Sequence, residues 1–435
     1  MNQILNEELI EALDFMRSKL TNVAPCYQRT HISDFSCVRC SGSAGRYVYE
    51  KQPHSSEQNT RVMSSRFSPS LCITHACNLN CVYCYQKHNA GTGMSFDTAK
   101  NIIDWVFAHI PTGMDGVEFT FIGGEPLLEF ELIKQIMDYT CKYYSGEKFI
   151  FYAASNGVLL TSEMKEWFAA NRDKFYLRLS LDGTKETHDY NRSGSFDKLD
   201  IDFFKNTWPG QGVKMTLSEF SLRNLAKDIK YIHSLGFDDI GGVNLAEGDF
   251  DWNKDEYIGI LAPQLKELVE YYLETGIRFD QLLDRSLDLC EAKNKFRKKR
   301  CGIGTGTLFF DVDGKRYPCT FITPMTFSQK EIEDVIHTDF SNDDKFLDEE
   351  CFNNCYIYPI CPTCSGSNYM VNKTFKRRNK KKCSLQKLIA LFIADLQGKM
   401  LLKNKYSMEA TMKYYTIEAI KKIKSLYYDE FKTYL

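Results

Sequence analysis

Between about residue 66 and residue 250, short runs rich in β-forming residues alternate with amphipathic helical stretches. This order is typical of βα units, in which each helix returns the chain to the next strand of a parallel sheet. We expect six strands, at residues 71–74, 117–122, 148–153, 176–181, 213–217 and 242–245. Six units are fewer than the eight of a closed barrel. The pattern therefore predicts an α/β fold built on a partial, open (β/α)6 barrel.

The stretches between these strands carry apolar residues at helical spacing. Over residues 95–110, Ser95 is placed to cap the first turn, and Ile102, Val106 and Ile110 recur on one face. In barrels of this class the chemistry lies at the carboxyl ends of the strands. We therefore expect functional residues directly after each strand.

The 435 residues are enough for two to four domains at about 100 to 200 residues each. Residues 1–65 form an N-terminal lead-in with a helix near its start, and residues 66–285 form the barrel. A cysteine-rich extension follows over residues 286–385, with a small β-hairpin at 307–312 and 315–318, and residues 386–435 form a helical tail.

Composition narrows the class of protein. With 43% hydrophobic and 26% charged residues the chain is of ordinary globular type, and its net charge of -2 predicts no nucleic acid partner and no attraction to an anionic membrane. No apolar run approaches the roughly 18 residues that span a bilayer. The acidic N-terminus is unlike a secretory signal. We expect a cytoplasmic protein.

The sixteen cysteines are unusual in number and in placement. In a reducing cytoplasm, clustered cysteines are expected to bind metal rather than to form disulfides. Three groups have ligand-like spacing, namely Cys77, Cys81 and Cys84; Cys301 and Cys319; and Cys351, Cys355, Cys361, Cys364 and Cys383. The others are Cys26, Cys37, Cys40, Cys72, Cys141 and Cys290.

Cys77, Cys81 and Cys84 follow the first strand with the spacing C-x3-C-x2-C. Three thiolates in one loop can hold three irons of a four-iron cluster, whereas electron-transfer clusters take four cysteines. The fourth iron then lacks a protein ligand and is open to chemistry. Zinc stays open on spacing alone, because His75 or His88 could supply a fourth ligand.

Short polar and glycine-rich segments follow the next three strands. They are Gly123-Gly124-Glu125-Pro126, Ser155-Asn156-Gly157 and Ser180-Leu181-Asp182-Gly183, with His188, Asp189 and Arg192 further on. Each segment alone is an ordinary turn sequence. Their order, one at the end of each successive strand, indicates a ligand site.

The cysteine loop, with Tyr83 before its last cysteine, resembles the signature of the radical S-adenosylmethionine (SAM) enzymes. The segment 123–126 is similar to the GGEP segment of that family. The resemblance implies that SAM binds the open iron of a [4Fe-4S] cluster held by Cys77, Cys81 and Cys84, with Glu125 near its ammonium group and Arg192 near its carboxylate. It implies contacts to SAM from Tyr83, Gly123, Gly124, Glu125, Pro126, Ser155, Asn156, Ser180, Asp182 and Arg192.

The later cysteines resemble the SPASM extension of radical SAM enzymes that modify peptides, although the two-residue and three-residue gaps are exchanged. Carried across by position, the resemblance assigns a distal cluster to Cys351, Cys355, Cys361 and Cys383. It assigns a nearer one to Cys301, Cys319 and Cys364. That makes three [4Fe-4S] clusters, the nearer auxiliary one having an open iron or a further ligand such as Cys290. A structural zinc region is the alternative.

The resemblance implies a radical SAM oxidoreductase that matures a ribosomally made precursor peptide. A 5′-deoxyadenosyl radical would start formation of a thioether or carbon-carbon crosslink, with an electron donor such as flavodoxin or ferredoxin. The alternative is an anaerobic sulfatase-maturating enzyme, which makes formylglycine from Cys or Ser. From another class, a non-enzymatic iron-sulfur protein would have no need of the segment 123–126.

The remaining cysteines are weaker candidates. Cys26, Cys37 and Cys40 could bind a metal with His31, but we favour ordinary reduced cysteines. Cys72 and Cys141 lie on an expected strand and helix, and we expect them to be packed core residues.

Overall fold

A computed structural model describes residues 4–20, 66–87, 93–295, 299, 301–403 and 408–435. Cys26, His31, Cys37, Cys40 and His88 lie outside the described residues. The strands are β1 (Pro69–Thr74), β2 (Val117–Gly123), β3 (Phe149–Ser155), β4 (Phe175–Leu179), β5 (Val213–Lys214), β6 (Ile240–Gly241), β7 (Leu308–Phe310) and β8 (Arg316–Tyr317). Five of the predicted barrel strands and the predicted hairpin overlap the observed ones, with β5 shorter than expected. The sixth strand, β6, lies directly before the predicted range 242–245, in which Leu245 forms only an isolated bridge with Leu217.

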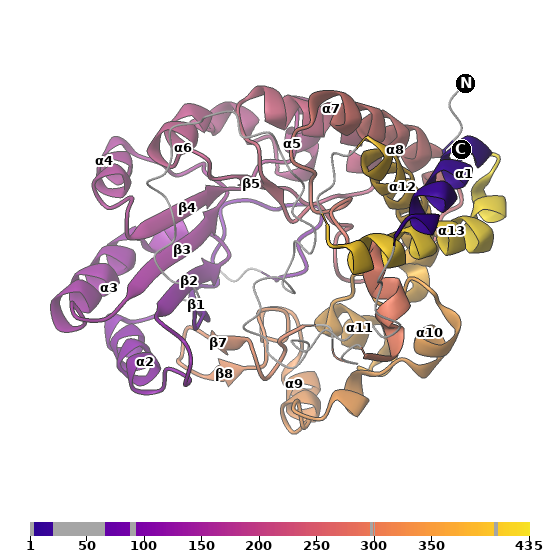
Figure 1. The fold of residues 1–435 in the computed structure, drawn as a ribbon. Helices are drawn as coiled ribbons and strands as arrows, with labels where there is room; N and C mark the ends of the chain where they lie inside the picture. The colour runs from indigo at the N-terminus through magenta and orange to yellow at the C-terminus, as the bar shows by residue number, and fades with distance from the viewer. Residues whose placement is uncertain (1–3, 21–65, 88–92, 296–298, 300, 404–407) are drawn as a thin grey trace.

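Helices connect the strands and form the C-terminal part of the chain (Figure 1). The α-helices are α1 (Glu7–Ser18), α2 (Phe96–Ala108), α3 (Phe130–Tyr143), α4 (Ser162–Ala170), α5 (Lys185–Asn191), α6 (Ile201–Thr207), α7 (Ser221–Ser234), α8 (Glu256–Thr275), α9 (Gln329–Ile336), α10 (Glu349–Asn354), α11 (Ser365–Asn372), α12 (Cys383–Leu402) and α13 (Ala410–Phe431). The 3-10 helices are η1 (Pro126–Glu129), η2 (Phe196–Lys198), η3 (Leu287–Lys295), η4 (Asp343–Phe346) and η5 (Lys380–Lys382). Ser95 caps α2 as predicted, accepting from the Thr98 N–H.

The first four strands form a parallel sheet in the order β4-β3-β2-β1. A parallel bridge between Ser180 and Lys214 links the end of β4 to β5, which pairs with β6. The β/α order therefore gives the expected open barrel. The hairpin β7–β8 joins this sheet, because β7 pairs in parallel with the free edge of β1. Part of the extension thus belongs to the barrel sheet, since an unpaired strand edge readily accepts a further strand.

Alternation along the strands separates two faces of the sheet. Phe119, Phe121, Phe151 and Phe175 point to the outer face and are fully buried, beneath the layer of α2, α3 and α4 (Figure 1). The alternate residues point inward and are only partly buried. The outer aromatic layer therefore holds the helices on the sheet, while the inner face is left to line a cavity.

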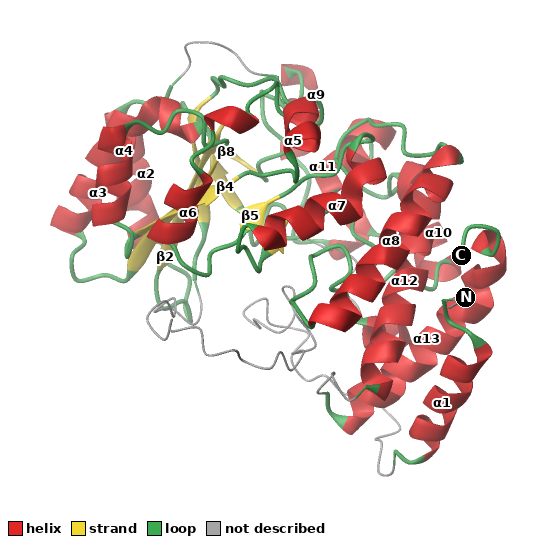
Figure 2. Cartoon of the chain, turned by 90° about the horizontal axis from the view of Figure 1, so that it is seen from above, coloured by secondary structure: helices red, strands yellow, loops and turns green. Residues whose placement is uncertain are grey.

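A group of helices at the other end of the molecule packs around α12 (Figure 2). This helix contacts α1, α8 and α13, and it is buried on nearly all sides, which explains its apolar sequence. Its one buried carboxylate, Asp395, accepts from the Leu5 N–H at 2.8 Å and pairs with Lys399 at 2.6 Å. The helical tail begins at Cys383, so a predicted metal-ligand position stands at its start.

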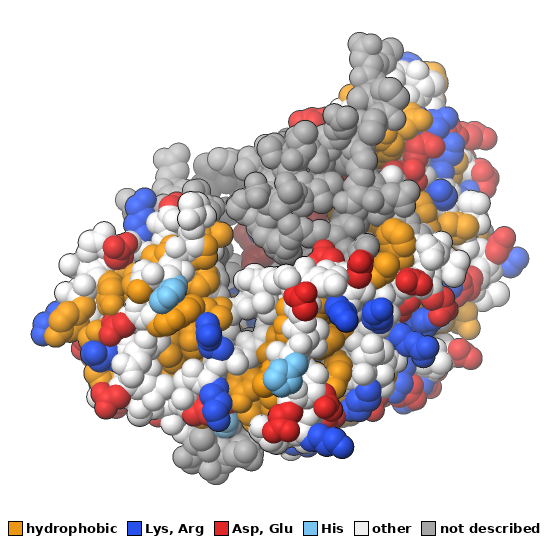
Figure 3. Space-filling model, turned by 90° about the horizontal axis from the view of Figure 1, so that it is seen from below, with side chains coloured by type: hydrophobic (Ala, Val, Ile, Leu, Met, Phe, Trp, Pro, Cys, Tyr) orange, Lys and Arg blue, Asp and Glu red, His pale blue; other side chains and the backbone are white. Residues whose placement is uncertain are grey.

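The described surface is mixed in charge. Acidic and basic side chains are interspersed on the described part of the face in Figure 3, in keeping with the net charge of -2. Among the described residues, no helix has both the length and the apolar character needed to cross a bilayer.

The outer aromatic layer leads to a stability prediction. The Phe151 ring stacks at 5.5 Å on the rings of both Phe119 and Phe121. Replacing Phe151 with Ala should lower the free energy of unfolding by about 3 to 5 kcal/mol, because it leaves a cavity in the core. Phe15→Ala is the matched control, since this phenylalanine is 64% exposed. Urea unfolding followed by circular dichroism measures the free energy of unfolding of both variants. An equal decrease in the two would contradict the view that Phe151 belongs to a tightly packed core layer.

Candidate active site

A cavity of about 490 Å³ lies on the inner face of the barrel, at the carboxyl ends of the strands. Its volume is in the range of small-molecule sites. It is lined by most of the predicted site residues, namely Cys77, Cys81, Tyr83, Cys84, Gly123, Gly124, Glu125, Pro126, Asn156, Ser180 and Arg192. Residues from segments more than 100 positions apart in the sequence therefore meet at one place, as the strand-end rule predicts.

The three thiols of the first cysteine group lie in the loop after β1 and line this cavity. Burial raises the pKa of Cys77 and of Cys84, and it raises the pKa of Cys81 to about 11. The neighbouring thiols add to the shifts of Cys77 and Cys81. Three convergent thiols at a cavity wall fit the three-cysteine side of an iron-sulfur cluster, whose binding would displace their protons.

The end of β2 is bound to the start of this loop through the backbone. The N–H of Gly124 donates to Thr74 O at 3.1 Å, and the N–H of Glu125 donates to Ala76 O at 2.9 Å. A Cβ atom at Gly124 would lie 2.1 Å from Ala76 O and 2.8 Å from the Cys77 Cβ. Only glycine allows the two segments to approach this closely.

The Glu125 residue borders the cavity, and its carboxylate accepts hydrogen bonds from the chain itself. It accepts hydrogen bonds from Leu127 N at 3.1 Å, Ser155 Oγ at 2.8 Å and Asn156 N at 2.7 Å, and its residue is 1% exposed. A buried carboxylate needs such donors. Glu125 therefore ties β2 to the end of β3, and Ser155, which serves this tie, is not among the cavity-lining residues.

Asp182 also holds cavity-lining residues in place, and it does not itself line the cavity. It is fully buried and accepts from Tyr83 Oη at 2.5 Å, from Arg192 Nε at 2.8 Å and from Thr216 N at 3.1 Å. The Arg192 guanidinium also lies over the Tyr83 ring, 5.4 Å from its centroid. The positive charge of Arg192 is thus paired with Asp182 within the chain, although its side chain borders the cavity.

Lys214 is a cavity residue that the sequence analysis missed. Among the described residues its ammonium group has no hydrogen bond or ion pair. The Lys214 side chain is exposed at the cavity. Desolvation by the surrounding chain, and then the charges of Arg192 and Arg178, lower the pKa of Lys214. An unpaired cation in a cavity is suited to an anionic ligand group. The signal in the sequence was a lysine inside a predicted strand, and the structure pairs this lysine with Ser180 in a parallel bridge.

The nearer auxiliary group lies close to the same cavity, because the cavity is lined by Thr320, which follows Cys319, and by Glu247, whose charge acts on Cys364. Burial and the nearby Cys301 thiol raise the pKa of Cys319 to about 11, and burial followed by Glu247 raises that of Cys364, with smaller contributions from Cys319 and Cys301. The three predicted ligands are therefore neighbours. Tyr85, directly after Cys84, stacks on Phe321 with ring centroids 4.1 Å apart and lines the cavity.

The distal group gathers around the start of α12. Burial raises the pKa of Cys383 to about 11, and the thiols of Cys361 and Cys355 add to this shift. The pKa of Cys351 is raised to about 12 by burial first, with Asp348 and Cys383 among the further causes. The chain thus brings together the four cysteines predicted for the distal cluster.

Cys290 and His75, the alternative ligands for the nearer auxiliary group and for the first cysteine group, have neighbours outside those groups. Cys290 lies beside Tyr356, whose pKa is raised first by burial and then by this thiol. Because Tyr356 follows Cys355, Cys290 stands on the side of the distal group rather than the nearer one that we considered for it. His75 does not turn to the first cysteine group, since its Nε2 lies 2.6 Å from Asp311 Oδ1.

Comparison with known proteins gives a family match over this part of the chain. Residues 71–200 match the model of the Radical SAM superfamily. The chain is 25% identical over 317 residues to a cysteine-type anaerobic sulfatase-maturating enzyme of Clostridium perfringens, covering 66% of this chain and 84% of that enzyme. It is 38% identical over 97 residues to the uncharacterized protein MJ0907 of Methanocaldococcus jannaschii, but this match spans only 32% of that protein and 22% of this chain.

Two solved structures share the fold. Native anSMEcpe with bound AdoMet matches with a TM-score of 0.61 and 20% identity, covering 78% of this chain and 99% of that chain. Streptococcus suis SuiB bound to the precursor peptide SuiA matches with a TM-score of 0.52 and 14% identity, covering 73% and 76%. The fold prediction is thereby confirmed. Residues 71–200 form a radical SAM domain, and the chain is an enzyme homologous to anaerobic sulfatase-maturating enzymes.

The contact at Gly124 yields a prediction for this domain. Gly124→Ala should displace the loop that carries Cys77 and lower the iron content after anaerobic reconstitution by about four irons per chain, the content of one [4Fe-4S] cluster. Gly146→Ala is the matched control, because a Cβ atom there would meet no atom within 4 Å. Iron analysis of both variants is the measurement. A Gly124→Ala variant with the full iron content would contradict the prediction.

Proposed function

We propose that this enzyme oxidatively modifies a ribosomally made peptide, with SAM bound in the barrel cavity. The observation that carries the proposal is the convergence of Cys77, Cys81 and Cys84 on one cavity wall, with the nearer auxiliary cysteines beside the same cavity. When bound, SAM and a reduced [4Fe-4S] cluster supply a 5′-deoxyadenosyl radical for hydrogen abstraction. The protein contributes the placement of both.

Different residues of the chain position the cysteine loop, fix the cavity wall and bind SAM. Gly124 lets the end of β2 lie against the cysteine loop, which sets the position of Cys77. Asp182 holds Tyr83 and Arg192, so their side chains have fixed positions at the wall. We assign the carboxylate of SAM to Lys214, because the Arg192 charge is already paired with Asp182. The other predicted contacts, Gly123, Pro126, Asn156 and Ser180, line the cavity.

Two auxiliary [4Fe-4S] clusters complete the proposal. Cys301, Cys319 and Cys364 would hold the nearer one, and the distal one would be held by Cys351, Cys355, Cys361 and Cys383. The cysteines of each set lie close to one another in the structure, which supports this assignment. Clusters near the cavity can take up the electron that an oxidised substrate loses. A reductant such as flavodoxin or ferredoxin is needed to start the reaction.

For the product we favour a thioether or carbon-carbon crosslink in a precursor peptide. The fold shared with SuiB, which was solved with a precursor peptide, supports a peptide substrate. Formylglycine formation is the second candidate, favoured by the homology to a sulfatase-maturating enzyme over 84% of its length. Mass spectrometry after co-expression with a candidate peptide, with and without hydrazide labelling, separates them. A crosslinked peptide loses two hydrogen atoms and stays unlabelled, whereas formylglycine carries an aldehyde that reacts.

The enzyme class is tested by SAM cleavage. The triple change of Cys77, Cys81 and Cys84 to Ala should abolish 5′-deoxyadenosine formation by the reduced, reconstituted protein, since no cluster can then form at this wall. Cys141→Ala, on α3 and away from the three groups, serves as control and should keep activity. Chromatography of the nucleoside products is the measurement. Undiminished 5′-deoxyadenosine from the triple variant would refute the proposal.

Lys214 gives a second, independent test. Lys214→Met should weaken SAM binding by about tenfold to a hundredfold, the usual cost of a lost hydrogen bond to a charged group. Isothermal titration of the reconstituted protein with SAM measures the change. The control is Lys227→Met, because this lysine is exposed and pairs with Glu186 at the surface. Equal SAM affinity in the two variants would show that Lys214 does not bind SAM.

A further inference from the structure

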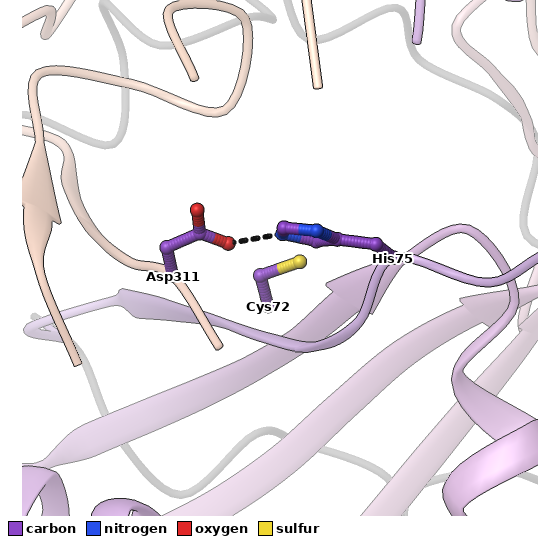
Figure 4. A group of neighbouring side chains, drawn as sticks. All are labelled: Cys72, His75 and Asp311. Carbon is purple, nitrogen blue, oxygen red and sulfur yellow. Dashed lines mark hydrogen bonds and ion pairs between the residues drawn. The ribbon is translucent and has the colours of Figure 1, made fainter. Parts of the chain in front are cut away.

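A further cluster of metal-ligating side chains, apart from the three cysteine groups, lies near the active-site cavity. Cys72, His75 and Asp311 point toward one another, as Figure 4 shows. Cys72 stands on β1, and His75 follows the same strand by one residue. Asp311 directly follows β7, which pairs in parallel with β1 so that Leu71 lies opposite Phe310. The three residues therefore meet at the carboxyl ends of two neighbouring parallel strands, a common place for ligand sites.

The distances suit a single small cation. The Cys72 Sγ, a nitrogen of His75 and a carboxylate oxygen of Asp311 all lie within 4.8 Å of one another. In a tetrahedral zinc site, bond lengths of about 2.0 to 2.3 Å place ligand atoms about 3.3 to 3.6 Å apart. The pair His75 Nε2 and Asp311 Oδ1, now 2.6 Å apart, would have to open by less than 1 Å to admit the ion. That movement is within reach of a side-chain rotation.

Burial makes the cluster costly unless its charges are balanced. Cys72, His75 and Asp311 are 1%, 7% and 3% exposed. A divalent cation bound to a thiolate, a neutral imidazole and a carboxylate leaves the site without net charge, which removes the penalty for a buried carboxylate. The Met325 Sδ lies 3.9 Å from the Cys72 Sγ and is a neighbour of the cluster, not one of its ligands.

We propose that Cys72, His75 and Asp311 bind one divalent cation of the zinc type. One sulfur, one nitrogen and one oxygen ligand form a donor set that Zn²⁺ accepts. On binding, the Cys72 thiol gives its proton to solvent, and the imidazole and carboxylate exchange their mutual hydrogen bond for bonds to the metal. No electrons are transferred. The site is separate from the three cysteine groups, and it does not depend on the proposed function.

The position of the site indicates a structural role. His75 stands two residues before Cys77, the first cysteine of the loop, whereas Asp311 stands at the end of β7, which leads through the hairpin to Cys319. A metal bound by both would therefore hold the cysteine loop against the extension. The competing interpretation is a neutral hydrogen bond between His75 and Asp311 next to a core thiol, which binds no metal.

Metal analysis of the reconstituted holoenzyme distinguishes the two. The protein, with its iron loaded first, is equilibrated with zinc chloride and desalted. We expect about one zinc per chain in the unchanged protein, with X-ray absorption at the zinc edge giving one sulfur neighbour at about 2.3 Å and nitrogen or oxygen neighbours at about 2.0 Å. Zinc displacing iron from the cysteine groups would instead give three or four sulfur neighbours.

Variants decide where the zinc is bound. Cys72→Ala and Asp311→Asn should each lose most of the zinc, while Cys141→Ala should keep it, with iron content as the check that each variant is folded. No zinc in the unchanged protein, or zinc that stays at the same level in Cys72→Ala and Asp311→Asn, would overturn the proposal. If either variant fails to fold, the sulfur count in the unchanged protein decides alone, and any count other than one refutes the site.

Discussion

The contact between the end of β2 and the loop after β1 is the constraint on which the rest of the site depends. Two backbone hydrogen bonds, from Gly124 to Thr74 and from Glu125 to Ala76, join these segments at a distance that no side chain at Gly124 would permit. Because the loop carries Cys77, the same contact places the thiols of the first group over the inner face of the sheet. The parallel pairing of β1 with β2 sets up this contact, and the outer aromatic layer supports the pairing.

Around this contact, buried charge is arranged so that little of it is left unmatched. Glu125 takes its donors from β3, and Asp182 takes them from Tyr83, Arg192 and Thr216. These bonds hold the strand ends at fixed spacing, which a site that positions a small ligand requires. Lys214 is the exception among the described cavity residues, since its exposed cation has no hydrogen bond or ion pair among them. The hydrogen-bond partners of a residue, more than its type, therefore distinguish a residue that supports the cavity wall from one that can contact a ligand.

The extension is continuous with the barrel. The hairpin β7–β8 completes the sheet at the edge of β1, and Tyr85 and Phe321 stack where the first cysteine loop meets the nearer auxiliary group. The His75–Asp311 pair lies at the same junction. Three contacts of different kinds therefore connect the cysteine loop to the extension, which keeps the cysteine groups at defined relative positions and makes the auxiliary region a part of the site.

The sequence by itself determined the order of the barrel strands, the cap at Ser95, the hairpin and the cysteine groups, because these depend on local periodicity, turn residues and spacing. It also determined that the segments after the strands meet, since parallel strands share a carboxyl edge. Only the tertiary structure decided which side chains face the cavity. Glu125 borders the cavity with its carboxylate already hydrogen-bonded within the chain, because a buried carboxylate needs donors, and Lys214 faces inward through strand alternation. The pairing of β7 with β1, and with it the meeting of Cys72, His75 and Asp311, joins residues more than 200 positions apart, which no local pattern could specify.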